Sequence, residues 1–142
     1  MTAENVFSIC NMLALAGWLM LIFAGKNAQA RFIAGVILPL SIAVVYALLL
    51  AAHGAESTGN FSSLAGVTAL FSNPWLLLAG WIHYLAFDLF IGAWEVRDAR
   101  ANGISHLLVI PCLLLTFLFG PVGLLLYFAI RAARLKSIIV AA

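Results

Sequence analysis

The sequence predicts an all-α integral membrane protein in which four transmembrane helices form a bundle. Hydrophobic residues make up 65% of the chain and charged residues only 8%, whereas a soluble domain carries roughly a quarter charged residues. Several apolar stretches also reach the ~20 residues that a helix needs to cross a hydrocarbon core of ~30 Å. These charged residues are too few to cover a globular surface in water, so we expect lipid to be the solvent of this fold.

Composition also argues against nucleic acid as a partner. The formal net charge is only +2, and the lysines and arginines are divided among loops and tail rather than gathered in one stripe. Cys10 and Cys112 lie in apolar stretches without metal or redox spacing, so we expect them to act as small hydrophobic residues. Membrane lipids are the expected partners, and the sequence leaves a homo-oligomer open.

The chain reads as a single transmembrane domain over residues 1–142. The first span covers about residues 6–24, and because no basic region precedes it, it is expected to be a retained span rather than a cleaved signal. After the polar stretch 25–31, the second span covers about residues 32–52. It contains Pro39, which a membrane helix tolerates where neighbouring groups satisfy the freed carbonyl.

A connector and the third span follow. Residues 61–71 combine a serine helix start with apolar residues at helical spacing, which predicts a short helix lying in the membrane interface; a surface loop is the alternative. The third span covers about residues 75–95 and begins at Pro74. At 1.5 Å per residue, Trp75 and Trp94 lie ~28 Å apart, which is the separation of two interfacial aromatic belts.

The fourth span, about residues 105–130, is interrupted by Gly120-Pro121. We expect one tilted helix with a kink at this pair. The alternative is a re-entrant hairpin that turns there, because each arm is short for a full crossing.

The basic residues bear on that choice. With four spans, both termini lie outside, and Lys26, Arg31, Arg97 and Arg100 share a side that should be cytoplasmic. The basic residues of the tail then fall on the opposite side. A re-entrant last segment would gather all seven basic residues of the chain at one side.

The third span contains the candidate functional residues. Asp88 is the carboxylate deepest in an apolar stretch, and a charge there costs ~3 kcal/mol on insertion scales, which points to a function. Glu95 lies seven residues later on the same helix face, and Gly92 leaves a gap in that face where a ligand or another helix can approach. The competing interpretation is that Asp88 holds the bundle together by bonding to Thr116 or another hydroxyl.

Two helix faces supply the predicted site. One continues from the acids to aromatic residues, and the other combines a histidine with aromatic residues. The predicted catalytic residues are Asp88, His83 and Glu95. The predicted substrate-binding residues are Trp81, Tyr84, Phe87, Gly92, Trp94, Thr116 and Tyr127.

No cofactor is predicted. The histidines fall at different depths, which disfavours haem ligated by two of them, and the paired Glu-x-x-His motifs of a di-iron bundle are missing. The short turn before the fourth span makes it an antiparallel neighbour of the third. It should bring His106 near Glu95 and Asp98, and Thr116 level with Asp88. A cation held by Glu95, Asp98 and His106 is the remaining metal hypothesis, although these are few ligands.

Several strings between Gly80 and Tyr127 resemble the abscisic-acid-deficient-four-like family. They read WIHYLAFDLFIGAWE at 81–95, GISH at 103–106, PCL at 111–113 and FGPVGLLLY at 119–127. Plant members of that family are linked to neoxanthin synthesis in the plastid. The resemblance implies a four-span membrane protein of carotenoid or isoprenoid metabolism. Because a plastid-targeting leader is not seen here, we expect a bacterial-type member in the inner (plasma) membrane.

The chemistry implied by the resemblance is that of a neoxanthin-synthase-like isomerase, which converts an epoxide to an allene without a redox cofactor. Such a step needs an acid, stabilisation of a cation, and a base. A carboxylic acid in an apolar interior can stay protonated at neutral pH, and aromatic ring faces stabilise positive charge. Asp88 is the candidate acid and His83 or Glu95 the base.

Other functions stay open at this point. The same groups would suit a membrane terpene cyclase, in which an acid protonates an epoxide or alkene. A non-catalytic subunit that binds a carotenoid or lipid, or that assembles with other proteins, is the rival from another class. A proton or small-solute pathway is a third hypothesis.

Overall fold

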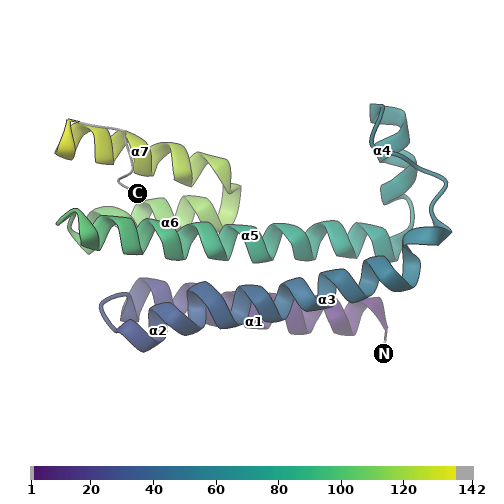
Figure 1. Ribbon diagram of the computed structural model, residues 1–142, viewed down its shortest axis with the longest axis horizontal. Coiled ribbons are helices and arrows are strands. Elements are labelled where there is room, and N and C mark those ends of the chain that lie inside the picture. The colour runs from purple at the N-terminus through teal and green to yellow at the C-terminus, as the bar shows by residue number, and fades with distance from the viewer. Residues whose placement is uncertain (1, 137–142) are drawn as a thin grey trace.

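The computed structural model describes residues 2–136, and every regular element within them is helical. Figure 1 shows long helices running side by side, with the short helix α4 set across their direction at one end. Three helical stretches are long and apolar enough to cross a membrane: Ala3–Ala24, Ala28–Glu56 and Pro74–Ala101. An all-helical protein with apolar spanning helices is therefore what the sequence led us to expect.

The first spanning helix, α1 (Ala3–Ala24), begins at a side-chain cap. Thr2 precedes it in an extended conformation, and its hydroxyl accepts a hydrogen bond from the backbone N–H of Asn5 at 3.3 Å. Such a cap satisfies one of the N–H groups that the first turn of a helix leaves unpaired. The helix ends beside Gly25, where the polar turn predicted from the sequence begins.

The second spanning stretch is one long rod made of α2 (Ala28–Phe32), a π-helical turn (Ile33–Ile37) and α3 (Leu38–His53). The π turn comes just before Pro39 and shifts the backbone pairing, so that the N–H of Leu38 bonds to the carbonyl of Ile33. Proline lacks an N–H group and collides with the preceding turn, and a π-helical turn is one of the local adjustments that accommodate it in a membrane helix.

The connector contains the predicted short helix, α4 (Leu64–Phe71). Ser63 caps it, because its hydroxyl accepts from the N–H of Gly66 at 3.0 Å. The axis of α4 runs across the bundle rather than along it (Figure 1). That is the orientation of a helix lying along a membrane surface.

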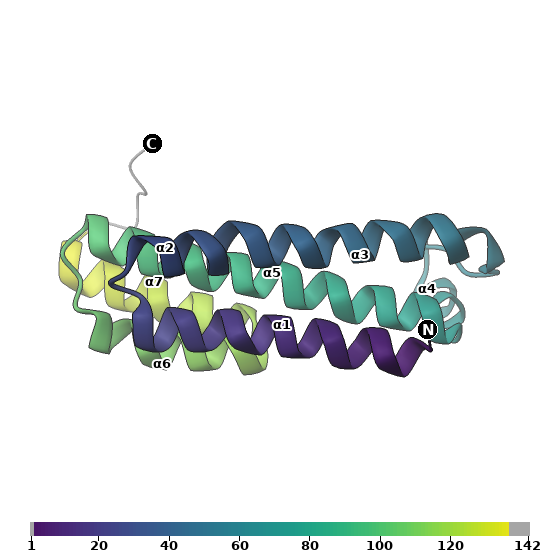
Figure 2. The ribbon, with the colours of Figure 1, turned by 90° about the horizontal axis from the view of Figure 1, so that it is seen from below.

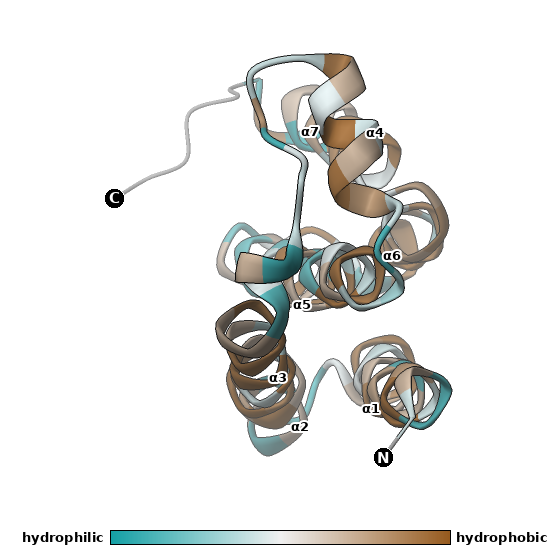
Figure 3. Ribbon diagram, turned by 90° about the vertical axis from the view of Figure 1, so that its right-hand side faces the viewer, coloured by the Kyte–Doolittle hydropathy of each residue, from teal (hydrophilic) through white to brown (hydrophobic). Residues whose placement is uncertain are grey.

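The central helix is α5 (Pro74–Ala101), which opens with proline in its first turn and is capped by the side chain of Asn73. In the view along the bundle, α5 lies between α1 and α3 on one side and the C-terminal helices on the other (Figure 3). Its small and aliphatic residues are buried on several faces of the helix. Every candidate site residue on α5 is therefore next to a neighbouring helix or a groove.

The C-terminal part differs from the single kinked span expected over residues 105–130. The helices α6 (His106–Phe119) and α7 (Pro121–Leu135) are separate, and α7 runs back alongside α6 (Figures 1 and 2). Gly120 turns the chain with φ 47° and ψ −98°, a conformation that side-chain-bearing residues rarely adopt. This is the arrangement of the alternative prediction, a hairpin that turns at Gly120-Pro121.

The absence of a side chain at Gly123 lets the two hairpin helices, α6 and α7, touch. A Cβ atom at Gly123 would overlap the Thr116 side chain and the Cys112 carbonyl on α6. With 14 and 15 residues, each arm is about 21–22 Å long at 1.5 Å per residue, which is shorter than a hydrocarbon core of ~30 Å.

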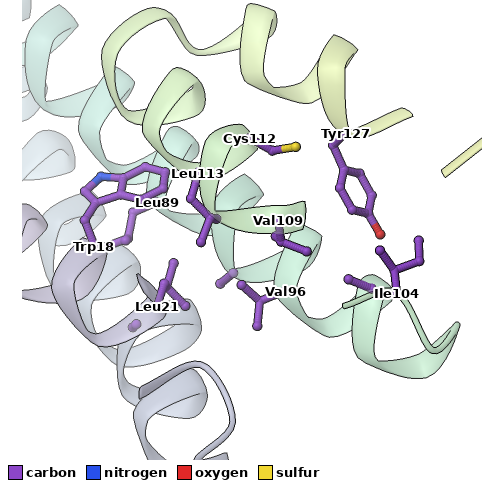
Figure 4. Packing of buried hydrophobic residues seen from close by; sticks show 12 residues of the cluster. Trp18, Leu21, Leu89, Val96, Ile104, Val109, Cys112, Leu113 and Tyr127 are labelled. Carbon is purple, nitrogen blue, oxygen red and sulfur yellow. The ribbon is translucent and has the colours of Figure 1, made fainter. Parts of the chain in front are cut away.

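Two hydrophobic clusters hold the bundle. One joins α1 and α5 to the hairpin through buried residues that include Trp18, Leu21, Leu89, Leu113 and Tyr127 (Figure 4). The other joins the opposite halves of α1, α3 and α5 and includes Cys10, Ile42 and Ile82. Both cysteines are free and buried, as expected of small hydrophobic residues. The bundle is thus covered by the hairpin over only one half of α5.

Candidate functional site

Three carboxylates on α5 face the α6–α7 hairpin. Asp88, Glu95 and Asp98 are spaced by seven and three residues, so they lie on one side of the helix. Each meets a different part of the hairpin: Asp88 its tip, Glu95 the last turn of α6, and Asp98 the far half of α7. The acidic face predicted from the sequence is therefore a contact surface between helices along most of its length.

Asp98 belongs to a fully bonded buried cluster. Its Oδ2 atom accepts from Nε of Arg131 at 2.8 Å and from the hydroxyl of Tyr127, and its Oδ1 atom accepts from Asn102 at 3.1 Å. Arg131 is only 2% exposed and Tyr127 is fully buried. Tyr127, expected to bind substrate, thus bonds to a neighbouring helix instead.

Sequence reasoning counted Arg131 among the basic residues of the tail and missed this ion pair. A signal was available, because Tyr127 and Arg131 lie four residues apart and so share a face of α7. The pair fixes the end of α7 to the end of α5. We interpret it as part of the packing, because the side chains of Asp98, Tyr127 and Arg131 are buried and bonded to one another.

Glu95 is also enclosed by the hairpin. Its Oε1 atom accepts from the Thr116 hydroxyl at 3.0 Å, and both side chains are fully buried. Its Oε2 atom has no hydrogen-bond partner among residues 2–136. Glu95 is therefore a sealed carboxyl group with one free oxygen.

Thr116 was expected level with Asp88, and the structure pairs it with Glu95. Side chains on a helix lean toward its N-terminus. On the antiparallel helices α5 and α6, Glu95 and Thr116 therefore lean toward each other along the axis, which brings the longer Glu95 carboxyl group to the Thr116 hydroxyl.

Asp88 lies at the tip of the hairpin and is only half-buried. A Cβ atom added to Gly120 would stand 3.1 Å from its Oδ1 atom, closer than an ordinary contact, so the carboxylate would have to shift slightly to admit a side chain there. The Tyr84 hydroxyl, one helical turn away, lies beside the carboxylate and donates to the Phe117 carbonyl at 3.2 Å. The Oδ2 atom of Asp88 has no partner in the described part of the chain.

The histidine–aromatic face of α5 points toward α3. His83 stacks on Phe87 with ring centroids 4.6 Å apart and lies 5.4 Å from the ring of Tyr46. Phe87 is 59% exposed and lines a small hollow of about 250 Å³ between α3 and α5. His83 and Asp88 are electrostatic neighbours, but they open toward different sides of α5.

Two further predicted residues serve helix packing. Gly92 was expected to leave a gap for a ligand or a helix, and the Trp18 ring of α1 fills it: a Cβ atom there would stand 2.7 Å from a ring carbon. Trp94 packs on the hairpin, stacked on Phe128 at 5.6 Å and edge-on to Tyr127 at 5.5 Å. Neither residue lines a described hollow.

The cation site considered for Glu95, Asp98 and His106 is not assembled. Nε2 of His106 hydrogen-bonds to the Ile22 carbonyl of α1 at 2.9 Å. No group of three histidine, cysteine or acidic residues within 2–136 is arranged to hold a metal ion. His106 instead joins the start of α6 to the end of α1.

Beyond the hairpin tip, three adjoining hollows surround the other half of α5, and together we call them the outer groove. The first, about 340 Å³, lies between α1 and α5; the second, about 280 Å³, between α4 and α5; the third, about 410 Å³, between α3, α4 and α5. Leu77 and Trp81 line the first two, and Phe71 and Gly80 line the last two. Neighbouring hollows thus share parts of their walls.

The outer groove brings together part of the predicted site. Trp81 and Tyr84 line it, with ring centroids 5.5 Å apart, and His83 lines its third hollow. The Nε1 atom of Trp81 also donates to Asn11 on α1 at 3.3 Å. Aromatic and aliphatic side chains dominate the walls, as expected for a site that takes an apolar ligand.

One of the comparisons with known proteins gives a match. A family model described as ABA DEFICIENT 4-like matches residues 5–127. Searches of curated proteins and of solved structures gave no match. The matched region runs from α1 into α7 and includes the acidic face, Gly120 and the outer groove. Because this match covers most of the chain, the protein belongs to the ABA DEFICIENT 4-like family.

Proposed function

We propose that this protein acts in carotenoid or related isoprenoid metabolism and isomerises or cyclises a lipophilic substrate by acid–base chemistry. The family suggests a membrane protein related to carotenoid metabolism, and the three long apolar helices suggest the same environment. The proposal takes the substrate from the membrane, because the walls of the outer groove are apolar.

The observation that supports this function best is the meeting of a groove and a partly free acid. The outer groove reaches Tyr84, and the hydroxyl of Tyr84 lies beside the Asp88 carboxylate. Asp88 keeps one oxygen without a protein partner. This oxygen is buried next to Tyr84, and we propose that it gives its proton to a substrate lying along Trp81 and Tyr84.

The proposed reaction leaves the number of protons unchanged, because the base takes up one proton for the one that Asp88 gives, and exchange with water restores both groups. Asp88 donates its proton to an epoxide oxygen, whose C–O bond breaks with its electron pair going to oxygen, or to an alkene, whose π electrons form the new C–H bond. Either step leaves a carbocation. The rings of Trp81 and Tyr84 stabilise the cation through their π faces. A base then removes a proton from a neighbouring carbon, which forms the new double bond.

Of the two candidate bases, His83 is the better placed. It lines the third hollow of the outer groove, on the other side of Gly80 from Tyr84. Glu95 is sealed beneath the hairpin by Thr116 and lines no described hollow. We therefore propose Asp88 as acid and His83 as base, with Glu95 behind them in the interior.

A non-catalytic binding subunit is the second candidate. It is favoured by the observation that Asp98 and Glu95 both bond to the hairpin, so that part of the acidic face serves packing. In such a protein the outer groove would hold a carotenoid or lipid without changing it.

The Asp88→Asn variant separates the two functions. It keeps the size of the side chain and removes the proton donor. In a host that makes carotenoids, we expect the variant to lose the product while its precursor accumulates and co-purifies with the protein in mild detergent. Pigment chromatography and mass spectrometry of the purified protein measure both quantities.

Glu56→Gln is the matched control, because Glu56 is an exposed carboxylate that lies outside the groove walls. It should leave the pigment profile unchanged. If Asp88→Asn also leaves that profile unchanged while a pigment or lipid still co-purifies, the enzymatic function is wrong and the binding function is supported.

A further inference from the structure

The re-entrant hairpin gathers every basic residue at one end of the bundle, which we call the basic end. It consists of Lys26, Arg31, Arg97, Arg100, Arg131, Arg134 and Lys136. The turn between α1 and α2, the end of α5 and the end of α7 all lie at this end in Figures 1 and 2. A single kinked last span would instead have carried three of these residues to the opposite side.

Most of this charge is not neutralised within the protein. Ion pairs among residues 2–136 are His53–Glu56 and Arg131–Asp98. The other six basic residues have no carboxylate partner in that part of the chain, and all except Arg31 are well exposed. Arg31 and Arg100 also lie close enough to repel each other. Two neighbouring guanidinium groups without an acid between them form a surface that an anionic group would stabilise.

The opposite end of the bundle carries the reverse pattern. Residues 2–12 and 53–74, which lie at this end, contain no lysine or arginine, and they contain the acids Glu4 and Glu56. The N-terminus of α1, the helix α4 and the start of α5 lie at this end (Figure 1). The outer groove is lined by residues of the same three elements together with α3.

We infer that the basic end binds the anionic phospholipid headgroups of the cytoplasmic leaflet, and that the outer groove therefore receives its ligand from the opposite leaflet. Basic residues next to membrane spans are retained on the cytoplasmic side, and that leaflet carries the anionic lipids that attract them. Because the outer groove lies at the end of the bundle away from the basic residues, it then meets the opposite leaflet. The second half of this inference rests on the proposed function, and the first half does not.

Orientation is tested with cysteines added at two exposed polar positions. Thr58→Cys lies in the connector next to the outer groove, and Gln29→Cys lies at the basic end. The native Cys10 and Cys112 are buried, so the unmodified chain is the blank. With a membrane-impermeant maleimide, we expect Thr58→Cys to be labelled in intact cells and Gln29→Cys only after the cells are permeabilised. The reverse result, or labelling of both in intact cells, overturns the inference.

Headgroup binding is tested with short-chain phosphatidylglycerol and phosphatidylcholine added to the detergent-solubilised protein. We expect phosphatidylglycerol to bind more tightly than phosphatidylcholine. Arg100→Gln should raise the dissociation constant for phosphatidylglycerol about fivefold, which corresponds to ~1 kcal/mol per basic residue near an anionic surface. Glu56→Gln, at the other end, should change nothing. Equal affinity for the two lipids, or no effect of Arg100→Gln, would contradict a headgroup site at the basic end.

These outcomes are separate from those of the proposed reaction. If Asp88→Asn leaves the pigment profile unchanged while the labelling follows the expected pattern, the reaction is wrong and the orientation stands. If the labelling is reversed while Asp88→Asn loses the product, the reaction stands and the ligand enters from the cytoplasmic leaflet.

Discussion

At the level of single residues, the three acids of α5 differ in how fully their carboxylate oxygens are hydrogen-bonded. Asp98 is bonded to a cation, a hydroxyl and an amide, whereas Glu95 and Asp88 each keep one buried oxygen without a partner among the described residues. Buried polar groups that are fully satisfied make the surrounding structure rigid. We therefore interpret Asp98 as a packing residue, and we propose acid chemistry for Asp88, which lies beside a residue of the outer groove, Tyr84.

The packing role of Asp98 predicts a large loss of stability in Asp98→Ala. Removing the carboxylate breaks the buried ion pair with Arg131, and breaking such a pair costs about 3–5 kcal/mol. The double variant Asp98→Leu/Arg131→Leu removes both charges and should recover much of that loss. Unfolding in a denaturing detergent, followed by tryptophan fluorescence, measures both. Equal stability of Asp98→Ala and the unmodified protein would show that the ion pair does not stabilise the fold.

At the level of the helices, the turn at Gly120 decides the shape of the C-terminal half. The residue has a positive φ, and the Asp88 carboxylate lies where its side chain would begin. The two short arms, α6 before this residue and α7 after it, cannot separately cross a bilayer. They must therefore remain packed on α5 and on each other. The hairpin therefore depends on this one glycine for its direction and for its fit against the acid.

Gly120→Ala should consequently destabilise the hairpin by about 1–3 kcal/mol, the cost of holding a side-chain-bearing residue in such a conformation. It should also increase protease cleavage between α6 and α7. Gly54→Ala is the matched control, because Gly54 has φ −60° and nothing lies within 4 Å of an added Cβ atom. If Gly120→Ala and Gly54→Ala have the same stability, the turn is not strained by a side chain and the argument from φ is wrong.

At the level of the whole molecule, the hairpin covers one half of α5, and the outer groove lies around the other half, between α5 and the helices α1, α3 and α4. Gly80 lines both the second and the third hollow and faces the ring of Phe71 on α4. A Cβ atom at Gly80 would stand 2.7 Å from that ring. The space in this part of the groove therefore depends on the absence of a side chain at this position.

Gly80→Leu should block the groove and reduce ligand binding at least about tenfold, which corresponds to ~1.4 kcal/mol. The amount of pigment or lipid that co-purifies with the protein measures this loss. Ala43→Leu is the control, because it makes a similar change in the separate hollow between α3 and α5. Retention of the ligand by Gly80→Leu, with Ala43→Leu unchanged, would exclude the outer groove as its binding site.

The sequence by itself determined the class of this protein and its apolar helices. Hydrophobic stretches of sufficient length have few alternatives to helices in lipid, because every backbone N–H and C=O group must be paired within the segment. Ser63 and Pro74 marked the starts of α4 and α5, because a helix cap and a first-turn proline act on the residues next to them in the sequence. Family membership was also readable, because the strings around Asp88 and Gly120 lie in one continuous stretch of chain.

Only the tertiary structure decided which polar residues meet. A glycine–proline pair is compatible with a kink and with a reversal, and the choice depends on what the next helix packs against. That choice placed Thr116 on Glu95, Arg131 on Asp98 and Gly120 on Asp88, contacts between residues 21 to 33 positions apart in the chain. Helical periodicity describes one helix at a time, so it gives the face on which a residue lies but not the partner that the face meets.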